Sequence, residues 1–252
     1  LRVLIVLGLL AAGNIVFHAE VLLTGAADYG IRIAIGAVIA LISLVGGRIV
    51  PSFTNNWLAR NNPGRMPVSF SRFDMVAVGA TAVALVAWIV APAHPLAGVL
   101  MLIAGVLQAI RLARWAGDRT LADRLVLVLH VGYFFVPLGF LLVGASALMT
   151  AVPPSAGIHA WTAGAVGLMT LAVMTRATLG HTGNALHAGA TTQVIYALVL
   201  VSALLRIVAA FSGSLALIEL AGAAWIGGFA LFVLTFGRLL VMRKPAWAEA
   251  RC

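Results

Sequence analysis

Cysteine and charged residues are both scarce in this chain of 252 residues. The one cysteine, Cys252, cannot form an internal disulfide, and it excludes metal sites built from two or four cysteines. Charged residues make up only 9% of the sequence, with 16 Lys and Arg against 7 Asp and Glu. Basic patches interleaved with aromatic residues are absent, so the net charge of +9 does not indicate nucleic-acid binding. A nucleophile–base pair and a glycine-rich phosphate loop are also absent, which argues against hydrolysis and phosphoryl transfer.

Long apolar runs make up most of the sequence. Hydrophobic residues account for 63% of the chain and the mean hydropathy is +1.10, values typical of an integral membrane protein. Backbone groups in lipid must bond within their own segment, so the runs predict membrane-spanning helices. The predicted spans are 2–23, 30–47, 73–92, 96–113, 123–146, 157–177, 190–210 and 215–241. The sequence therefore predicts an all-α fold, a polytopic transmembrane helix bundle of about eight spans, with residues 1–252 forming one domain.

The distribution of basic residues supports this count of spans. The loops after the second, fourth and sixth spans and the C-terminal segment carry most of them, whereas the other loops are nearly free of Arg and Lys. These basic residues are Arg48, Arg60, Arg65, Arg72, Arg111, Arg114, Arg119, Arg124, Arg176, Arg238, Arg243, Lys244 and Arg251. The positive-inside rule then predicts that both ends of the chain are cytoplasmic. Residues 46–70, which hold clusters of Pro and Asn, are predicted to form an irregular loop with a short interfacial turn at Trp57.

Two arginines depart from this distribution. Arg32 opens the second span and Arg206 lies about one turn before the end of the seventh, both at the outer face. Each can extend to the outer headgroups, or form a salt bridge or bind an anionic ligand inside the bundle. Asp28 and Glu219 are predicted at the same depth and are the candidate partners.

A histidine inside a membrane span costs free energy unless it is paired, so each one needs a reason. His18 shares a helix face with Asn14, four residues earlier, whereas Glu20 points away. This pair is compatible with a metal ligand or a proton relay, and equally with a hydrogen bond between helices. His130 is predicted near the middle of the fifth span, with Tyr133 on the same side three residues later. Its apolar surroundings favour a ligand.

The remaining histidines lie at the ends of spans or between them. His159 opens the sixth span, where an interfacial residue and a ligand both fit the pattern, and His94, between two prolines, is predicted to lie in a loop. His181 and His187 follow the sixth span in a glycine-containing turn that is either a shaped polar site or a plain surface loop. Several histidines without a cysteine cluster suit haem iron, copper or zinc. Their spacing does not show which of them meet.

Three stretches of the sequence resemble a known family. They are GGRIVPSFTNNWL (46–58), LADRLVLVLHVGYFFVPLGFLL (121–142) and HAWTAGAVGLMTLAVMTRATLGHTGNAL (159–186). The family is NnrS, and the resemblance extends over the whole chain, with the third stretch the longest and most specific. Its members are polytopic proteins of the bacterial inner membrane, usually with about twelve spans. They are described as haem- and copper-containing and are linked to nitric oxide metabolism and resistance to nitrosative stress.

The resemblance implies a membrane protein that binds haem and copper and handles nitric oxide or a related small molecule. The polar positions carried over are Asn14, His18, Arg48, His130, His159, Arg176 and His181. The four histidines among them are the candidate metal ligands, and the guanidinium of Arg176 suits a haem propionate. Family members carry further helices upstream and this chain begins Leu-Arg, so we expect residues 1–252 to be about the C-terminal two-thirds of a longer protein.

Two other functions compete with this one. A haem–copper redox enzyme needs a close pair of histidines on one helix, and the close pair here, His181 and His187, lies outside a span. A small-molecule transporter is favoured by helix breaks and acidic residues at the membrane midplane. Pro137 can kink the fifth span, but span centres hold no acidic residue apart from the off-centre Glu20. The residues alone leave open whether the chain catalyses a reaction.

Overall fold

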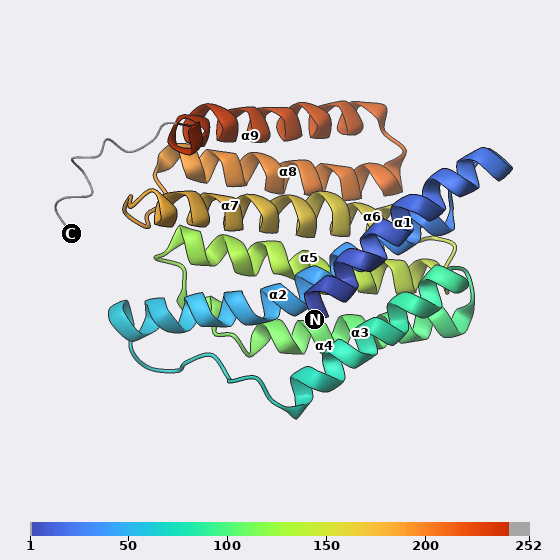
Figure 1. The fold of residues 1–252 in the computed structure, drawn as a ribbon, viewed down its shortest axis with the longest axis horizontal. Coiled ribbons are helices and arrows are strands. Elements are labelled where there is room, and N and C mark those ends of the chain that lie inside the picture. Colours follow the sequence, from blue (N-terminus) through green and yellow to red (C-terminus); the bar gives the residue numbers. More distant parts are fainter. Residues whose placement is uncertain (1, 242–252) are drawn as a thin grey trace.

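The computed structural model describes residues 2–241, and within that range every regular element is a helix (Figure 1). The elements are α1 (Arg2–Thr24), α2 (Tyr29–Asn61), α3 (Arg72–Val90), α4 (Pro95–Ala113), η1 (Gly117–Arg119), α5 (Arg124–Ser146), α6 (Pro154–His159), η2 (Ala160–Val166), α7 (Gly167–His181), α8 (Ala190–Ser212) and α9 (Leu215–Val241). The C-terminal segment, which was predicted to be cytoplasmic, lies outside the described residues. It contains Arg243, Lys244, Arg251 and Cys252.

The described residues contain eight helical segments that are long and apolar enough to cross a membrane, which confirms the predicted number of spans. The sixth of these segments is composite, because α6, the π-helical η2 and α7 follow one another without a break from residue 154 to residue 181. The all-α transmembrane bundle predicted from the hydropathy pattern is therefore the observed fold.

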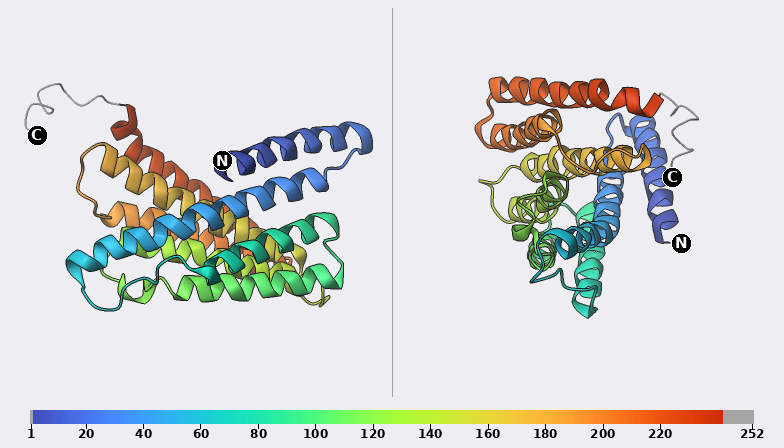
Figure 2. Two further views of the ribbon diagram at one scale, coloured as in Figure 1. Left: turned by 60° about the horizontal axis from the view of Figure 1, so that its bottom comes forward. Right: turned by 90° about the vertical axis from the view of Figure 1, so that its left-hand side faces the viewer.

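Helix α5 lies at the centre of the bundle and packs against α2, α4, α6, η2 and α7. Helices α8 and α9 pair with each other on one side, and α3 packs mainly on α4 and α2 on the other (Figures 1 and 2). Helix α1 packs along α2 and leaves most of its own surface exposed, and Figure 2 shows α1 and the start of α2 diverging from the rest of the bundle.

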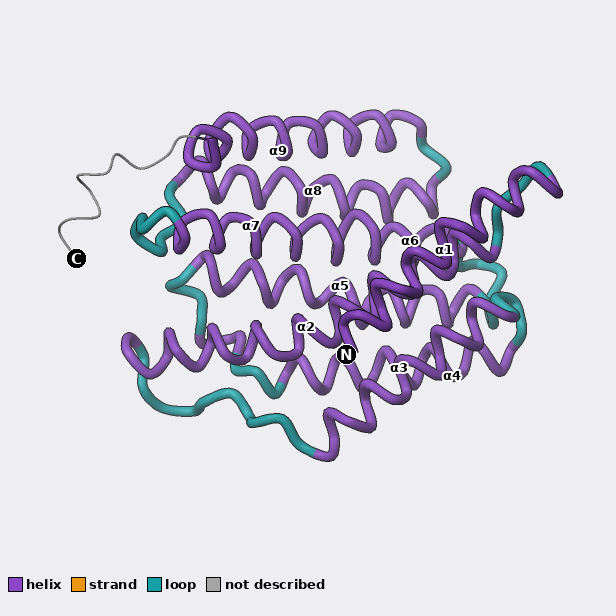
Figure 3. Tube along the Cα trace, viewed as in Figure 1, coloured by secondary structure: helices purple, strands orange, loops and turns teal. Residues whose placement is uncertain are grey.

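The connections between helices lie at two opposite ends of the bundle (Figure 3). The loops after α2, α4 and α7 share one end, which we call the Arg-rich end because residues 60–72, 111–124 and 176 supply most of its charge. The loops after α1, α3, α5 and α8 share the opposite end. The fold therefore brings the basic loops together, as the positive-inside rule requires.

Helix α2 is much longer than predicted. Residues 46–61 continue the helix instead of forming an irregular loop, so the prediction of a turn at Trp57 was wrong. Pro51 removes one backbone donor, but the helix persists because Val50, Thr54 and Leu58 form a buried stripe with helical spacing. The packing of this stripe offsets the local cost of the proline.

The described residues do not form the candidate salt bridges of the two outer arginines. None of the three ion pairs found among residues 2–241 includes Asp28 or Glu219. Arg32 instead donates from Nε to the Ile89 carbonyl at 3.1 Å, and its guanidinium lies over the Tyr29 ring at 4.7 Å. Glu20, predicted to lie off-centre, accepts hydrogen bonds from the backbone N–H groups of Tyr29 and Gly30 at 3.0 and 2.7 Å, and thereby caps the start of α2.

Close contact between α5 and η2 depends on a glycine. The fully buried indole of Trp161 donates from Nε1 to the Val136 carbonyl at 3.1 Å and contacts the edge of Phe140. A Cβ added to Gly139 would lie 2.2 Å from Trp161 Cδ1, so only glycine admits the indole at this position.

We predict that Gly139→Ala destabilises the protein. The bonded indole has no space to retreat into, and overpacking of this kind costs about 1–3 kcal/mol. Gly79→Ala is the matched control, because a Cβ at Gly79 in α3 meets no atom within 4 Å and should be neutral or slightly stabilising. Thermal unfolding midpoints in detergent check this prediction, and equal midpoints for the two variants would contradict it.

Candidate functional site

His130 is the buried histidine of the described chain. It lies about two turns from the N-terminal end of α5 (Arg124–Ser146), nearer to that end than the predicted position at the middle of the span. Its imidazole Nε2 lies 2.8 Å from the Oγ1 of Thr54 on α2. The extension of α2 beyond the predicted span is what places Thr54 beside the imidazole.

The hydrogen bonds of Thr54 determine the tautomer of His130. The Thr54 hydroxyl donates its hydrogen to the Val50 carbonyl at 2.8 Å. A hydroxyl has one hydrogen, so Thr54 can only accept from the imidazole, and the proton is assigned to Nε2 of His130. Nδ1 is then unprotonated and carries a lone pair, and it has no hydrogen-bond partner within residues 2–241. The ring is thus oriented through one nitrogen while the other is available to a ligand.

The His130 ring borders a pocket of about 490 Å³. Apart from His130 and Asp118, the lining is glycine and apolar side chains: Leu112, Ala113, Gly117, Leu121, Leu127, Val131 and Phe134. Gly117 contacts the imidazole closely, since a Cβ at this position would lie 2.5 Å from Nδ1. Any side chain at Gly117 would therefore clash with the imidazole, and glycine leaves Nδ1 without a covering side chain.

A short turn presents Gly117 to the imidazole. The preceding residue, Ala116, is fully buried and adopts a left-handed conformation with φ of 54°, which is unfavourable for a residue with a Cβ. The Thr120 hydroxyl donates to the Gly117 carbonyl at 2.7 Å, and the Asp123 carboxylate caps α5 by accepting from the Leu125 N–H at 2.8 Å. These bonds hold the backbone in a conformation that it would otherwise leave.

A buried ionic network lies next to this turn. Arg111 on α4 is only 1% exposed and donates from Nε to the Asp74 carboxylate at 3.2 Å. Its Nη1 donates to the Ser43 carbonyl at 2.9 Å and to the Tyr133 hydroxyl at 3.1 Å. Asp74 also accepts from the Ser71 N–H at 2.9 Å and lies 3.5 Å from Arg114. Both charges of the central pair are thus surrounded by further polar partners.

Gln108 completes the network. Its Oε1 accepts from the Tyr133 hydroxyl at 2.8 Å, and its Nε2 lies 2.8 Å from Ser43 Oγ and 2.7 Å from Thr81 Oγ1. Helices α2, α3, α4 and α5 each contribute at least one side chain. The network is therefore a polar connection among four helices inside the apolar bundle.

Sequence reasoning missed this network. Arg111 was interpreted as a loop charge that reports topology, and that interpretation was wrong because the residue lies within α4 and is buried. A signal was present, since Gln108 and Arg111 are three residues apart and share a helix face within an otherwise apolar segment. Their common face indicates a polar neighbour, but the pattern does not identify which helix supplies it.

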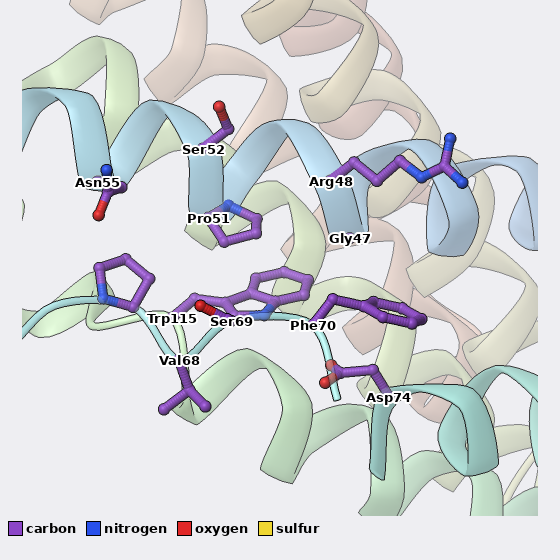
Figure 4. Close-up of a pocket in the computed structure, with 11 residues that line it drawn as sticks. Gly47, Arg48, Pro51, Ser52, Asn55, Val68, Ser69, Phe70, Asp74 and Trp115 are labelled. Atoms are coloured by element: carbon purple, nitrogen blue, oxygen red, sulfur yellow. The ribbon is translucent and has the colours of Figure 1, made fainter. Parts of the chain in front are cut away.

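A second pocket, of about 500 Å³, is lined by Trp115 together with residues of α2 and of the segment that precedes α3 (Figure 4). Figure 4 shows the Trp115 indole between Pro51 of α2 and the segment that leads to Phe70, with Asp74 at one end. The indole packs against the edge of Tyr133 at 4.7 Å, so this wall is continuous with the buried network. Arg48 lines the pocket, and in the figure its side chain extends along α2.

The other predicted site residues lie on separate parts of the bundle. Asn14 and His18 are exposed on α1, and His181 is exposed at the end of α7. Arg176 is half-buried, with its guanidinium 4.1 Å above the Phe53 ring. His159 lines a pocket between α6, η2, α8 and α9. Within residues 2–241, no three His, Cys, Asp or Glu side chains come together as a metal site.

The positions of these residues show how well the described chain suits each of the two implied cofactors, haem and copper. One imidazole with an unprotonated nitrogen at an apolar pocket fits an axial ligand of haem iron. Copper is held by several ligands at once, and the described residues do not assemble such a group.

The fold and this pocket define a class: a polytopic α-helical membrane protein with a buried histidine beside an apolar cavity. The chain belongs to the NnrS family, because the family model described as NnrS protein matches residues 1–244. Comparison with curated proteins and with solved structures gives no match.

We predict that Asp74→Asn strongly destabilises the bundle. The change removes the negative charge between Arg111 and Arg114, and leaving a buried charge without its partner costs about 3–5 kcal/mol. Asp118→Asn is the matched control, because Asp118 pairs with Arg65 at the surface, where such pairs contribute little. The thermal unfolding midpoint in detergent is measured for both variants. A midpoint for Asp74→Asn within 1 °C of the wild type would show that the network is not needed for stability, because 1 °C corresponds to about a quarter of a kcal/mol.

Proposed function

We propose that this chain is part of a haem-binding protein of the bacterial inner membrane that acts in nitric oxide metabolism or in resistance to nitrosative stress. The single observation that carries the proposal is the unprotonated Nδ1 of His130 beside an apolar pocket, in a chain of the NnrS family. The collection of the basic loops at one end supports a membrane orientation with that end in the cytoplasm.

Haem fits the surroundings of His130 for two reasons. A haem macrocycle is largely apolar, and Leu112, Leu127 and Phe134 provide an apolar lining for it. An imidazole that ligates a metal donates its other N–H to an oxygen acceptor, which fixes the ring and raises the basicity of the ligating nitrogen. Thr54 is that acceptor for Nε2.

The protein residues have three roles in this proposal. His130 would hold the iron through Nδ1, Thr54 would keep the ring in one tautomer, and the lack of a side chain at Gly117 would leave room for the ligand beside Nδ1. The mostly apolar lining suits the macrocycle. Haem, when bound, supplies an iron atom that takes nitric oxide or a related diatomic molecule. Copper is assigned no step, because the described residues do not form a site for it.

We predict that His130→Ala abolishes a haem signal that the wild-type protein shows. The measurement is the reduced-minus-oxidised absorbance spectrum of the full-length protein purified in detergent, together with haem extraction. His94→Ala is the control, because His94 only caps α4 by accepting from the Leu96 N–H at 3.2 Å. Full haem content in well-folded His130→Ala protein would reject His130 as the ligand.

Two further variants separate ligation from folding. Thr54→Val removes the acceptor for Nε2 and should leave haem bound but shift its absorbance bands. Gly117→Leu places a side chain against Nδ1 and should prevent haem binding while His130 is still present. A wild-type protein that is folded but yields no haem on extraction would remove the proposal altogether.

A further inference from the structure

A pocket of about 360 Å³ lies between α6, η2, α8 and α9. Helix α6 and the loop from α8 to α9 lie at the end of the bundle opposite the Arg-rich end (Figure 1). His159, Thr162 and Ala163 line it from the composite sixth span. Ser202 and Arg206 line it from α8, and the start of α9 closes it with Ala221, Gly222, Trp225 and Ile226. The His130 pocket shares none of these residues, so the two sites are separate.

Arg206 is the strongest charge at this pocket. It is half-buried within the α8 span, where a charge is costly unless it is compensated. Neither Arg206 nor His159 forms an ion pair or a side-chain hydrogen bond among residues 2–241. The pocket therefore contains a guanidinium and an imidazole whose donors are unused.

The other polar groups of the pocket already have partners. The Thr162 hydroxyl donates to the Ile158 carbonyl at 2.8 Å, and the Ser202 hydroxyl donates to the Ala221 carbonyl at 2.7 Å. Both hydroxyls are thus satisfied without Arg206 or His159. Small residues at Ala221 and Gly222 leave the space in front of the guanidinium open.

The backbone at this pocket is unusual. The π-helical segment η2 begins directly after His159 and ends at Val166. A π-helical turn inserts an extra residue into a helix and occurs frequently at functional sites, because it alters which direction the adjoining side chains face. Trp225 packs so closely on the start of α7 that a Cβ at Gly167 would lie 2.7 Å from its ring, which fixes the wall of the pocket.

We propose that this pocket binds an anion, either a small singly charged oxyanion or a phosphate group, through Arg206 and His159. The guanidinium supplies charge and paired donors, which suit oxygen anions. The same positive charge disfavours a metal cation at His159, so we assign this histidine to the anion and not to a metal. A negatively charged oxygen group of this kind has two sources, a dissolved anion and the phosphate of a phospholipid headgroup. The proposal does not depend on haem at His130.

Thermal unfolding of the full-length protein in a neutral detergent tests the proposal, with sodium nitrite and inorganic phosphate as probes. Saturating probe should raise the unfolding midpoint of the wild type by about 2–4 °C. Arg206→Gln should lose this shift, and Arg206→Lys should retain part of it. Arg32→Gln is the matched control, because Arg32 is also half-buried near the same end but bonds to the Ile89 carbonyl, and it should keep the full shift.

A second arm identifies the source of the anion. The same measurement is made with phosphatidylglycerol or phosphatidylcholine added to the micelles. An Arg206-dependent shift with phosphatidylglycerol alone assigns the site to a lipid phosphate, and a shift with nitrite or inorganic phosphate assigns it to a dissolved anion.

A pocket-filling variant keeps the proposal testable if Arg206→Gln fails to fold. Gly222→Leu retains both charged side chains, and a Cβ at this glycine meets no atom within 4 Å, but the larger residue fills the pocket and should remove the shift. The proposal is overturned if no probe gives a shift that depends on Arg206 or on the open space at Gly222.

Discussion

The ion pair between Arg111 and Asp74 organises helices α2 to α5. Two charges removed from water are tolerated only when their mutual attraction is supplemented by hydrogen bonds to the remaining donors and acceptors. Ser43, Tyr133 and the other members of the network supply those bonds from neighbouring helices. Moving any one of these helices would strip partners from a buried guanidinium, so the network favours a single arrangement of the four. Gly47 is part of this arrangement, since a Cβ there would lie 2.0 Å from Arg111 Nη2.

The same network leads directly to the His130 pocket. Arg111 lies close to the end of α4, and its guanidinium is 5.4 Å from the ring of Trp115. The chain then turns through the left-handed Ala116 and brings Gly117 against the imidazole. Arg111 contacts neither His130 nor its pocket, but it packs on the tryptophan that directly precedes the turn lying against Nδ1. The interactions of Arg111 therefore contribute both to the packing of helices α2 to α5 and to the surroundings of the His130 pocket.

The number of spans was predictable because each span is a property of its own segment. Hydropathy and the arginine distribution are local, and they identified all eight spans and placed the basic loops at one end. The continuation of α2 was not predictable, because Pro51 and the asparagines resemble a loop in isolation and the buried positions that stabilise the helix belong to tertiary packing. The partnership of Thr54 and His130 is likewise a contact between residues 76 positions apart. Local periodicity carries no information about such a pair.

The turn at Gly117 is also anchored to the surface of the protein. Arg119 Nη2 donates to the Asn62 carbonyl at 3.0 Å, and Asp118 pairs with Arg65, so the turn is tied to the loop that joins α2 and α3. Because a Cβ at Gly117 would lie 2.5 Å from Nδ1 of His130, the position of this turn determines the room beside that nitrogen. The surface loop between α2 and α3 is thereby linked, through the turn, to the space beside the His130 imidazole.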